Sequence, residues 1–230
     1  MRTVCGTARR IEVAVGRGRR LAPSPVRPLA AARHSLLSDG VGEQRRGGVR
    51  LDQVDGTTCG SAVLVALAAW ADPAEVERLA GTGGDVGPGL GLRWDARQRQ
   101  VHRQTNRFWP RALGTTPWAM VRWLREHVPG AGPYRVRLVD DASSGDVAAA
   151  LDEIGAALAV GRPVPMLVGS FLPRHYVLAL GPVARAGEGR WRVYEPTSGT
   201  VRALDPGLAR RRALRGVLGY DRLHAALLPG

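Results

Sequence analysis

Residues 53–71, QVDGTTCGSAVLVALAAWA, join a loop rich in Gly and Thr to an unbroken apolar segment. Strong helix formers fill residues 61–71, so we expect a helix there. This helix has almost no polar side, and it should therefore be buried on most of its circumference. Asp72-Pro73 ends it and can begin a second helix over 73–80. The sequence thus predicts a buried helix with Cys59 at its entrance.

The predicted secondary structure of the remaining segments changes along the chain from mostly helices to mostly strands. Thr116-Pro117 is typical of a helix start, and residues 92–108 fit a surface helix after a Gly-rich loop. A strand over 134–139 is followed by a helix that Ser144 or Asp146 caps. Short strands punctuated by Gly come next, at 164–168, 175–180, 191–194 and 200–204. Helices first and an antiparallel sheet afterwards predict an α+β fold.

Length and charge divide the chain into two parts. A chain of 230 residues forms one decorated domain or two small ones. The net charge is +13, and all 33 basic residues are Arg, as a GC-rich coding sequence favours. Residues 1–50 hold 11 of these Arg and only three acidic residues. We expect this segment, rich in Arg, Gly and Pro, to be a mobile extension, with a single ordered domain over residues 51–230.

Composition also narrows the classes of function. The two cysteines, Cys5 and Cys59, are too few for a disulfide framework or a Cys-rich zinc site, and we expect no metal or organic cofactor. No apolar run is long enough to span a membrane, and no secretory signal is evident, which favours the cytoplasm. The basic excess lies in the extension, so a solvated tail is favoured over a nucleic-acid tether. Oligomeric state leaves no trace in the sequence.

Cys59 lies where a nucleophile would be activated. The positive end of a helix dipole favours an anion, and thus the thiolate form of Cys59. Its own backbone N–H, free at the helix start, can donate to a developing oxyanion. Gln53, six residues upstream, is a candidate for the second donor, although capping a turn is an equally good interpretation. Cys59 itself also has a plainer interpretation, as a small buried apolar residue.

A nucleophile needs a base and a group that orients the base. His34 falls in the extension, and His102, His127 and His224 fall in or near expected helices. His175 opens an apolar strand, where its ring would have a defined direction and could take the thiol proton. Glu195 ends a later strand, and a hairpin would return it to His175 as the acceptor. A core histidine and a surface carboxylate are the alternatives.

These residues resemble, in order, the motifs of the papain-like cysteine peptidases of the C39-like branch, which is related to peptidases that process double-glycine leaders. The matching pieces are Gln53-x5-Cys59-Gly60, Gly114-Thr115-Thr116-Pro117, Gly161-Arg162-Pro163-Val164-Pro165 with His175-Tyr176-Val177, and Glu195-Pro196-x-x-Gly199. The resemblance covers residues 51 to about 204.

The resemblance implies a papain-like fold, with helices packed on a C-terminal antiparallel sheet, and a peptide or protein substrate. It implies Cys59 as nucleophile, Gln53 as oxyanion donor, His175 as base and Glu195 as the orienting group. The family usually has Asp at the last position, so the longer Glu195 leaves open whether Thr197, Ser198 or Asp205 acts instead.

Two other functions remain open at this stage. The same pair of residues could transfer an acyl group to an amine, as transglutaminase-like enzymes do. A catalytically degenerate domain that binds a peptide or a partner would fit the same fold. We expect a thiol-dependent hydrolase of peptide or amide bonds.

Overall fold

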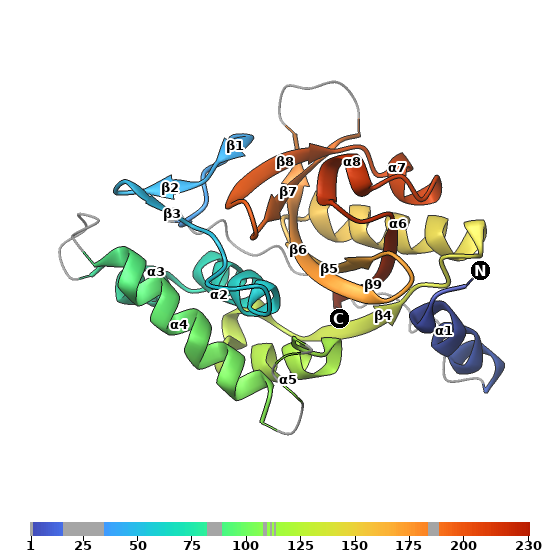
Figure 1. Cartoon of the computed structure of the whole chain (residues 1–230), viewed down its shortest axis with the longest axis horizontal. Helices are drawn as coiled ribbons and strands as arrows, with labels where there is room; N and C mark the ends of the chain where they lie inside the picture. The colour runs from blue at the N-terminus through green and yellow to red at the C-terminus, as the bar shows by residue number, and fades with distance from the viewer. Residues whose placement is uncertain are drawn as a thin grey trace.

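The computed structural model describes residues 2–15, 35–81, 89–107, 110, 112, 114–183 and 189–230. Its centre is a seven-stranded sheet in the order β1-β8-β7-β6-β5-β9-β4 (Figure 1). All neighbours in this sheet are antiparallel. The strands are β1 Gly42–Glu43, β4 Tyr134–Leu138, β5 Val164–Gly169, β6 Pro173–Pro182, β7 Trp191–Glu195, β8 Thr200–Leu204 and β9 Arg222–Pro229.

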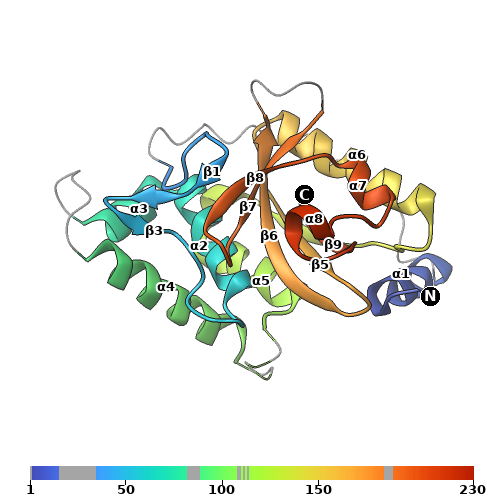
Figure 2. The same cartoon turned by 45° about the horizontal axis from the view of Figure 1, so that its top comes forward.

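Helices cover both faces of the sheet, and each face has its own apolar core (Figures 1 and 2). Alternation along β6 supplies both cores, because Tyr176 and Leu178 face one side and Val177 and Ala179 face the other. The first face packs against α2 Cys59–Ala71 and α5 Pro117–His127, and α3 Pro73–Ala80 and α4 Leu90–Thr105 pack on α2. The second packs against α6 Ser144–Ala159, α7 Gly207–Arg210 and α8 Arg215–Leu218. The fold is therefore α+β, as predicted.

The central helix is buried as the sequence predicts. Every residue of α2 from Cys59 to Ala69 is buried. The predicted strands after Gly161 and the helix start at Pro117 are confirmed, and Thr116 accepts a hydrogen bond from the Ala119 N–H at 3.3 Å. The cap of α6 was predicted one residue or more too late. Ser143 caps that helix through the Asp146 N–H at 3.2 Å.

The C-terminal strand β9 lies inside the sheet, between β5 and β4. The sequence did not predict this strand, because the short apolar run after Arg222 is rich in Ala and fits a helix as well as a strand. His224, expected near a helix, is a buried residue of β9. The strand joins the two parts of the sheet that come before and after α6.

Part of the N-terminal segment belongs to the fold. Helix α1 Val4–Ala14 packs near β4 and β9, strand β1 pairs with β8, and β2 Arg45–Arg46 pairs with β3 Val49–Arg50. The prediction that ordered structure begins near Leu51 is therefore wrong for residues 2–15 and 35–50. Most of the helix candidate at 29–37 lies outside the described residues.

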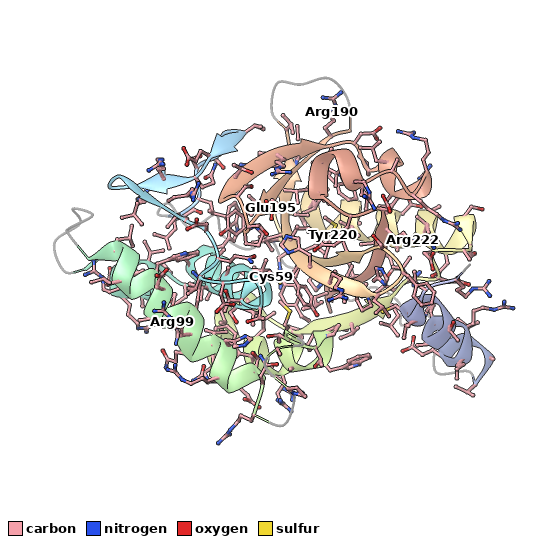
Figure 3. The ribbon with its side chains drawn as sticks, viewed as in Figure 1. Cys59, Arg99, Arg190, Glu195, Tyr220 and Arg222 are labelled. Carbon is pink, nitrogen blue, oxygen red and sulfur yellow. The ribbon has the colours of Figure 1, made fainter. Side chains whose placement is uncertain are left out.

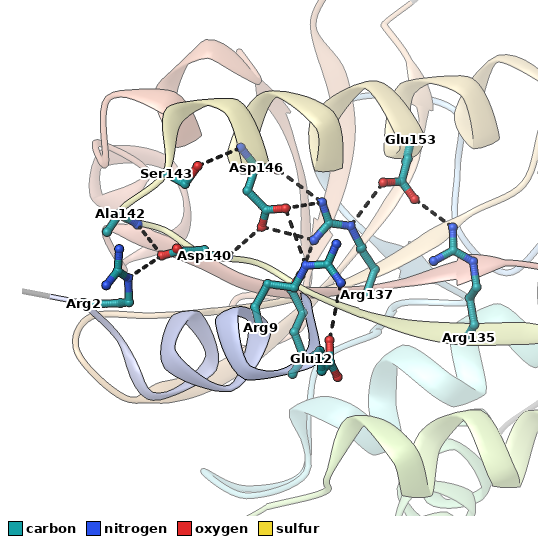
Figure 4. A network of polar contacts seen from close by, with 11 residues as sticks. Arg2, Arg9, Glu12, Arg135, Arg137, Asp140, Ala142, Ser143, Asp146 and Glu153 are labelled. Carbon is teal, nitrogen blue, oxygen red and sulfur yellow. Dashed lines mark hydrogen bonds and ion pairs between the residues drawn. The ribbon is translucent and has the colours of Figure 1, made fainter. Parts of the chain in front are cut away.

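Polar anchors explain why apolar periodicity missed helix α1. Arg2 donates to Asp140 at 2.8 Å, and Arg9 lies 3.5 Å from Asp146 at the start of α6 (Figure 4). Arg137 binds the same Asp146 carboxylate at 2.7 Å. Cys5 is half-buried, and burial followed by the charge of Asp141 raises its pKa to about 11. Ion pairs and hydrogen bonds, rather than an apolar stripe, hold this helix in place.

Within the described ranges, no single helix is long and apolar enough to cross a bilayer. Helices α2 and α3 reach that threshold only together, as a pair bent by 116°.

Asp141 is the main anchor of α1, and we predict that Asp141→Asn loosens this helix. Asp141 accepts from the Thr3 N–H at 3.0 Å, from the Thr3 hydroxyl at 2.7 Å and from Arg222 at 2.5 Å. Losing the charge should lower the free energy of unfolding by about 2 kcal/mol, the scale of a hydrogen bond to an ionised group. Hydrogen exchange should accelerate across residues 4–14.

The pH dependence checks the same prediction. Burial raises the pKa of Asp141, but Thr3 and Arg222 outweigh it and hold the pKa below its usual range. The stabilisation is therefore present above the unfolded-state pKa and is lost as pH falls through the folded-state pKa. Asp152→Asn, at a carboxylate that is 78% exposed, is the control. Equal exchange of α1 in the parent and Asp141→Asn would contradict the anchor role.

Candidate active site

Cys59 is the first residue of α2, and the loop before it is closed by its own hydrogen bonds. The Asp55 carboxylate accepts from the Thr57 N–H at 2.8 Å and from its hydroxyl at 2.7 Å. Thr58 returns to the same loop, where its hydroxyl accepts from the Asp55 N–H at 3.0 Å. The Cys59 N–H, at the first helical position, has no acceptor within the helix. The loop therefore presents both the sulfur and a backbone donor at one helix end.

Gly60 lets the helix start lie directly on strand β6. A Cβ atom at Gly60 would lie 3.2 Å from the Tyr176 ring and 3.3 Å from the Thr115 Cβ. Tyr176 follows His175 on β6, so this contact sets the start of α2 beside the part of the strand that carries His175. Interaction with the Cys59 side chain is among the causes that raise the pKa of His175, so the two side chains are close enough to affect each other. Two residues that are 116 positions apart in the chain thus share one site.

Glu195 lies on the other side of the His175 ring. Its Oε1 is 2.8 Å from His175 Nε2, across the antiparallel pair of β6 and β7. Both side chains are about 5% exposed, which strengthens their interaction because little water screens it. The extra methylene of Glu195, relative to Asp, does not prevent the contact. Figure 3 shows Cys59 at the start of α2 with Glu195 on the neighbouring sheet.

The residues named as substitutes for Glu195 have other partners. Thr197 and Ser198 donate their backbone N–H groups to Glu195 at 2.8 and 3.0 Å. Asp205 accepts from the Gly207 N–H at 2.7 Å and pairs with Arg211. Of the four acceptors that the sequence left open, Glu195 is the one in contact with His175.

His175 and Glu195 each stabilise the charged form of the other. Burial lowers the pKa of His175, but hydrogen bonds and charge from Cys59 and Glu195 outweigh it and raise the pKa to about 9. Burial raises the pKa of Glu195, yet hydrogen bonds from His175, Ser198 and Thr197 hold it well below its usual range. An ionised carboxylate only accepts, so His175 Nε2 carries a proton and Nδ1 is the nitrogen left for Cys59.

Gln53 lies beside this cluster in a different role from the expected one. Its amide Nε2 donates to the Asp55 carbonyl at 2.6 Å, and its Oε1 accepts from the Thr197 hydroxyl at 3.3 Å. Its backbone N–H donates to the Pro196 carbonyl at 2.8 Å. Gln53 thus ties the Cys59 loop to the turn after Glu195. Its role as an oxyanion donor stays a prediction.

The other histidines have different surroundings. His102 lies in α4 beside Asn106, and His127 stacks on Trp123 in α5. His224 lies in β9, where its Nε2 is 3.2 Å from the Ser170 carbonyl. His34 lies outside the described residues.

Tyr220 and Arg202 also belong to the site, and the sequence analysis missed both. The Tyr220 ring stacks on His175 with centroids 5.7 Å apart. Arg202 lies 3.4 Å from Glu195 Oε2. Tyr220 follows Gly219, whose φ of 79° turns the chain after α8. Neither residue stands in a motif, although Arg202 on β8 lies only seven residues after Glu195.

Metal ligands are not grouped in the described ranges, where no three His, Cys, Asp or Glu side chains lie close enough together to hold an ion. No protein-family model matches the chain, and no curated protein matches it either.

We predict that Glu195→Gln lowers the pKa of His175 from about 9 toward its ordinary value of 6.5, because the carboxylate charge is lost. Titration of the His175 ring by NMR measures this shift directly. Glu77→Gln, an exposed glutamate on α3, is the matched control.

Stability should change with pH in the same variant. A raised histidine pKa stabilises the fold fully below 6.5, and this contribution is lost as pH rises through 9. The advantage of the parent over Glu195→Gln should therefore shrink between these values in urea titrations. An unchanged His175 titration in Glu195→Gln would show that the carboxylate does not act on the ring.

Proposed function

We propose that the chain is a thiol-dependent hydrolase of peptide or amide bonds, with a papain-like fold of the C39-like type. The observation that carries the proposal is the grouping of Cys59, His175 and Glu195 in one site. A carboxylate oxygen lies 2.8 Å from a buried imidazole, and the Cys59 side chain acts on the same imidazole. A nucleophile, a base and an orienting acceptor are thereby brought together.

The chemistry follows from the positions of the protons. His175 Nδ1 takes the thiol proton, and the Cys59 sulfur attacks the carbonyl carbon of the scissile bond. The Cys59 N–H donates to the oxygen on which negative charge develops. The imidazolium then protonates the leaving amine, and a thioester of Cys59 remains. Water, deprotonated by the same imidazole, hydrolyses the thioester and restores the thiol.

The architecture supports the same proposal. The nucleophile begins a buried helix, the base lies on an antiparallel strand packed against that helix, and the acceptor lies on the next strand. Strands and helices hold side chains more firmly than loops do, which suits a site that needs angstrom-level alignment. The order of Cys, His and acceptor along the chain is that of the resemblance described above.

The rival functions differ in what they require of this geometry. A degenerate binding domain has no need for an ionised acceptor held against the imidazole, so the contact between His175 and Glu195 favours an enzyme. Acyl transfer to an amine uses the same first half-reaction. Addition of a primary amine to the assay, followed by mass analysis of the products, separates transfer from hydrolysis.

We predict that Cys59→Ala and His175→Ala each reduce turnover by about 10³-fold or more, because each removes a member of a unit that acts together. The assay exposes a peptide library made from a digested proteome to the protein and identifies new termini by mass spectrometry. Cys5→Ala and His127→Asn are the matched controls, since neither residue contacts the site. Turnover that persists in Cys59→Ala would eliminate the thiol mechanism.

Alkylation tests the nucleophile without a substrate. We predict that iodoacetamide modifies Cys59 faster than Cys5 at pH 6, since the imidazole can hold the thiol proton and Cys5 is held neutral by burial and Asp141. Peptide mapping by mass spectrometry gives the rate at each cysteine. His175→Ala should slow the reaction at Cys59 alone. Equal rates at both cysteines in the parent would count against an activated Cys59.

A further inference from the structure

Glu195 is also held from the side away from His175, by residues that the proposed steps do not use. The Ser198 hydroxyl is 2.5 Å from Glu195 Oε2 and 2.7 Å from the Thr200 hydroxyl. Arg202 donates to the Ser198 hydroxyl at 3.0 Å and to the Thr200 hydroxyl at 3.1 Å. It also donates to the Val217 carbonyl of α8, which ties the guanidinium to the body of the molecule.

Donor and acceptor chemistry decides which group donates in each of these hydrogen bonds. A guanidinium only donates, and an ionised carboxylate only accepts. The Ser198 oxygen receives the N–H of Arg202, so the single hydroxyl hydrogen of Ser198 is left to point at Glu195. Thr200 receives a second N–H of Arg202 and can donate to Ser198. Both hydroxyl groups are thus forced to donate toward the carboxylate.

The two carboxylate oxygens of Glu195 have different hydrogen-bond partners. Oε2 takes the Ser198 hydroxyl and the Ser198 N–H, while Oε1 takes the Thr197 N–H and faces His175. The Arg202 guanidinium lies 3.4 Å from Oε2 as well, so the carboxylate cannot rotate away from the ring without breaking these contacts. The longer Glu side chain has more rotamers than Asp, so this restraint matters more here.

We propose that Ser198 is a positioning residue that, oriented by Arg202, holds the Glu195 carboxylate against His175 in the hydrolytic reaction. The inference rests on the proposed function for its kinetic part. Its structural part concerns His175 and Glu195 alone. In this arrangement Arg202 fixes the direction of the Ser198 hydroxyl, Ser198 fixes the carboxylate, and the carboxylate fixes the ring that faces Cys59.

The experiment compares Ser198→Ala, Ser198→Thr and Arg202→Gln in the full chain, with Arg211→Gln as control. Arg211 pairs with Asp205 at the surface, at 3.0 Å, and has no contact with the site. The readouts are the NMR titration of His175, kcat/KM across pH for a peptide cleaved by the parent, and the free energy of unfolding.

Ser198→Ala should lower the midpoint of the His175 titration by about one pH unit and kcat/KM by roughly tenfold, the scale of one hydrogen bond to an ionised group. Ser198→Thr, which keeps the hydroxyl, should stay within about threefold of the parent. Arg202→Gln combined with Ser198→Ala should lose less than the product of the two single losses, because both act on the same carboxylate. Arg211→Gln should change none of these.

An unchanged His175 titration in Ser198→Ala would overturn the proposal, as would a loss of kcat/KM that tracks loss of folded protein alone. If Ser198→Ala does not fold, Ser198→Gly, which also lacks the hydroxyl, decides through the same titration, and an unchanged midpoint again overturns the proposal. If the parent cleaves no peptide but the titration shifts as expected, the proposed function fails and the positioning role of Ser198 stands.

Discussion

The start of helix α2 lies against strand β6, and the rest of the site depends on that contact. Gly60 has no side chain, so the backbone of α2 can approach the Tyr176 ring closely. The burial of α2 from Cys59 to Ala69 supplies the apolar driving force for this approach. This contact sets the start of α2 beside the first residues of β6, which include His175. A bulkier residue at position 60 would push the two apart.

A set of polar contacts lies next to this apolar contact. His175 lies against Glu195, Glu195 lies against the turn at 196–199, and that turn is tied back to the Cys59 loop by Gln53. These contacts therefore lead from His175 back to the loop that carries Cys59. Gly199 adopts a φ of 60° and lies close to the Arg50 side chain and the Leu51 carbonyl, so the turn also packs on the strand segment before the Cys59 loop. Helix, strand and turn are thus coupled through the buried pair of His175 and Glu195 and through Gln53 and Thr197, which are partly or fully exposed.

Sequence reasoning predicted those parts of the fold that local sequence signals encode. The apolar run after Ser61, the Thr116-Pro117 helix start and the strands after Gly161 carry periodicity or capping chemistry, and the structure confirms them. The contact between His175 and Glu195 followed from a hairpin, which is also local. Helix α1 and strand β9 were missed because their places depend on ion pairs with Asp140, Asp141 and Asp146 and on pairing between distant segments. Tyr220 was missed for the same reason, since only the folded chain brings it to the ring.

The position of strand β9 has a consequence for biosynthesis. Residues 222–229 fill the space between β5 and β4, so β4 has no neighbour on that side until they have left the ribosome. The nascent chain therefore carries β4 unpaired while residues 139–221 are made, a condition that invites aggregation or chaperone capture. The seven-stranded sheet is complete only after this strand has emerged, because β9 alone connects β4 to the other strands.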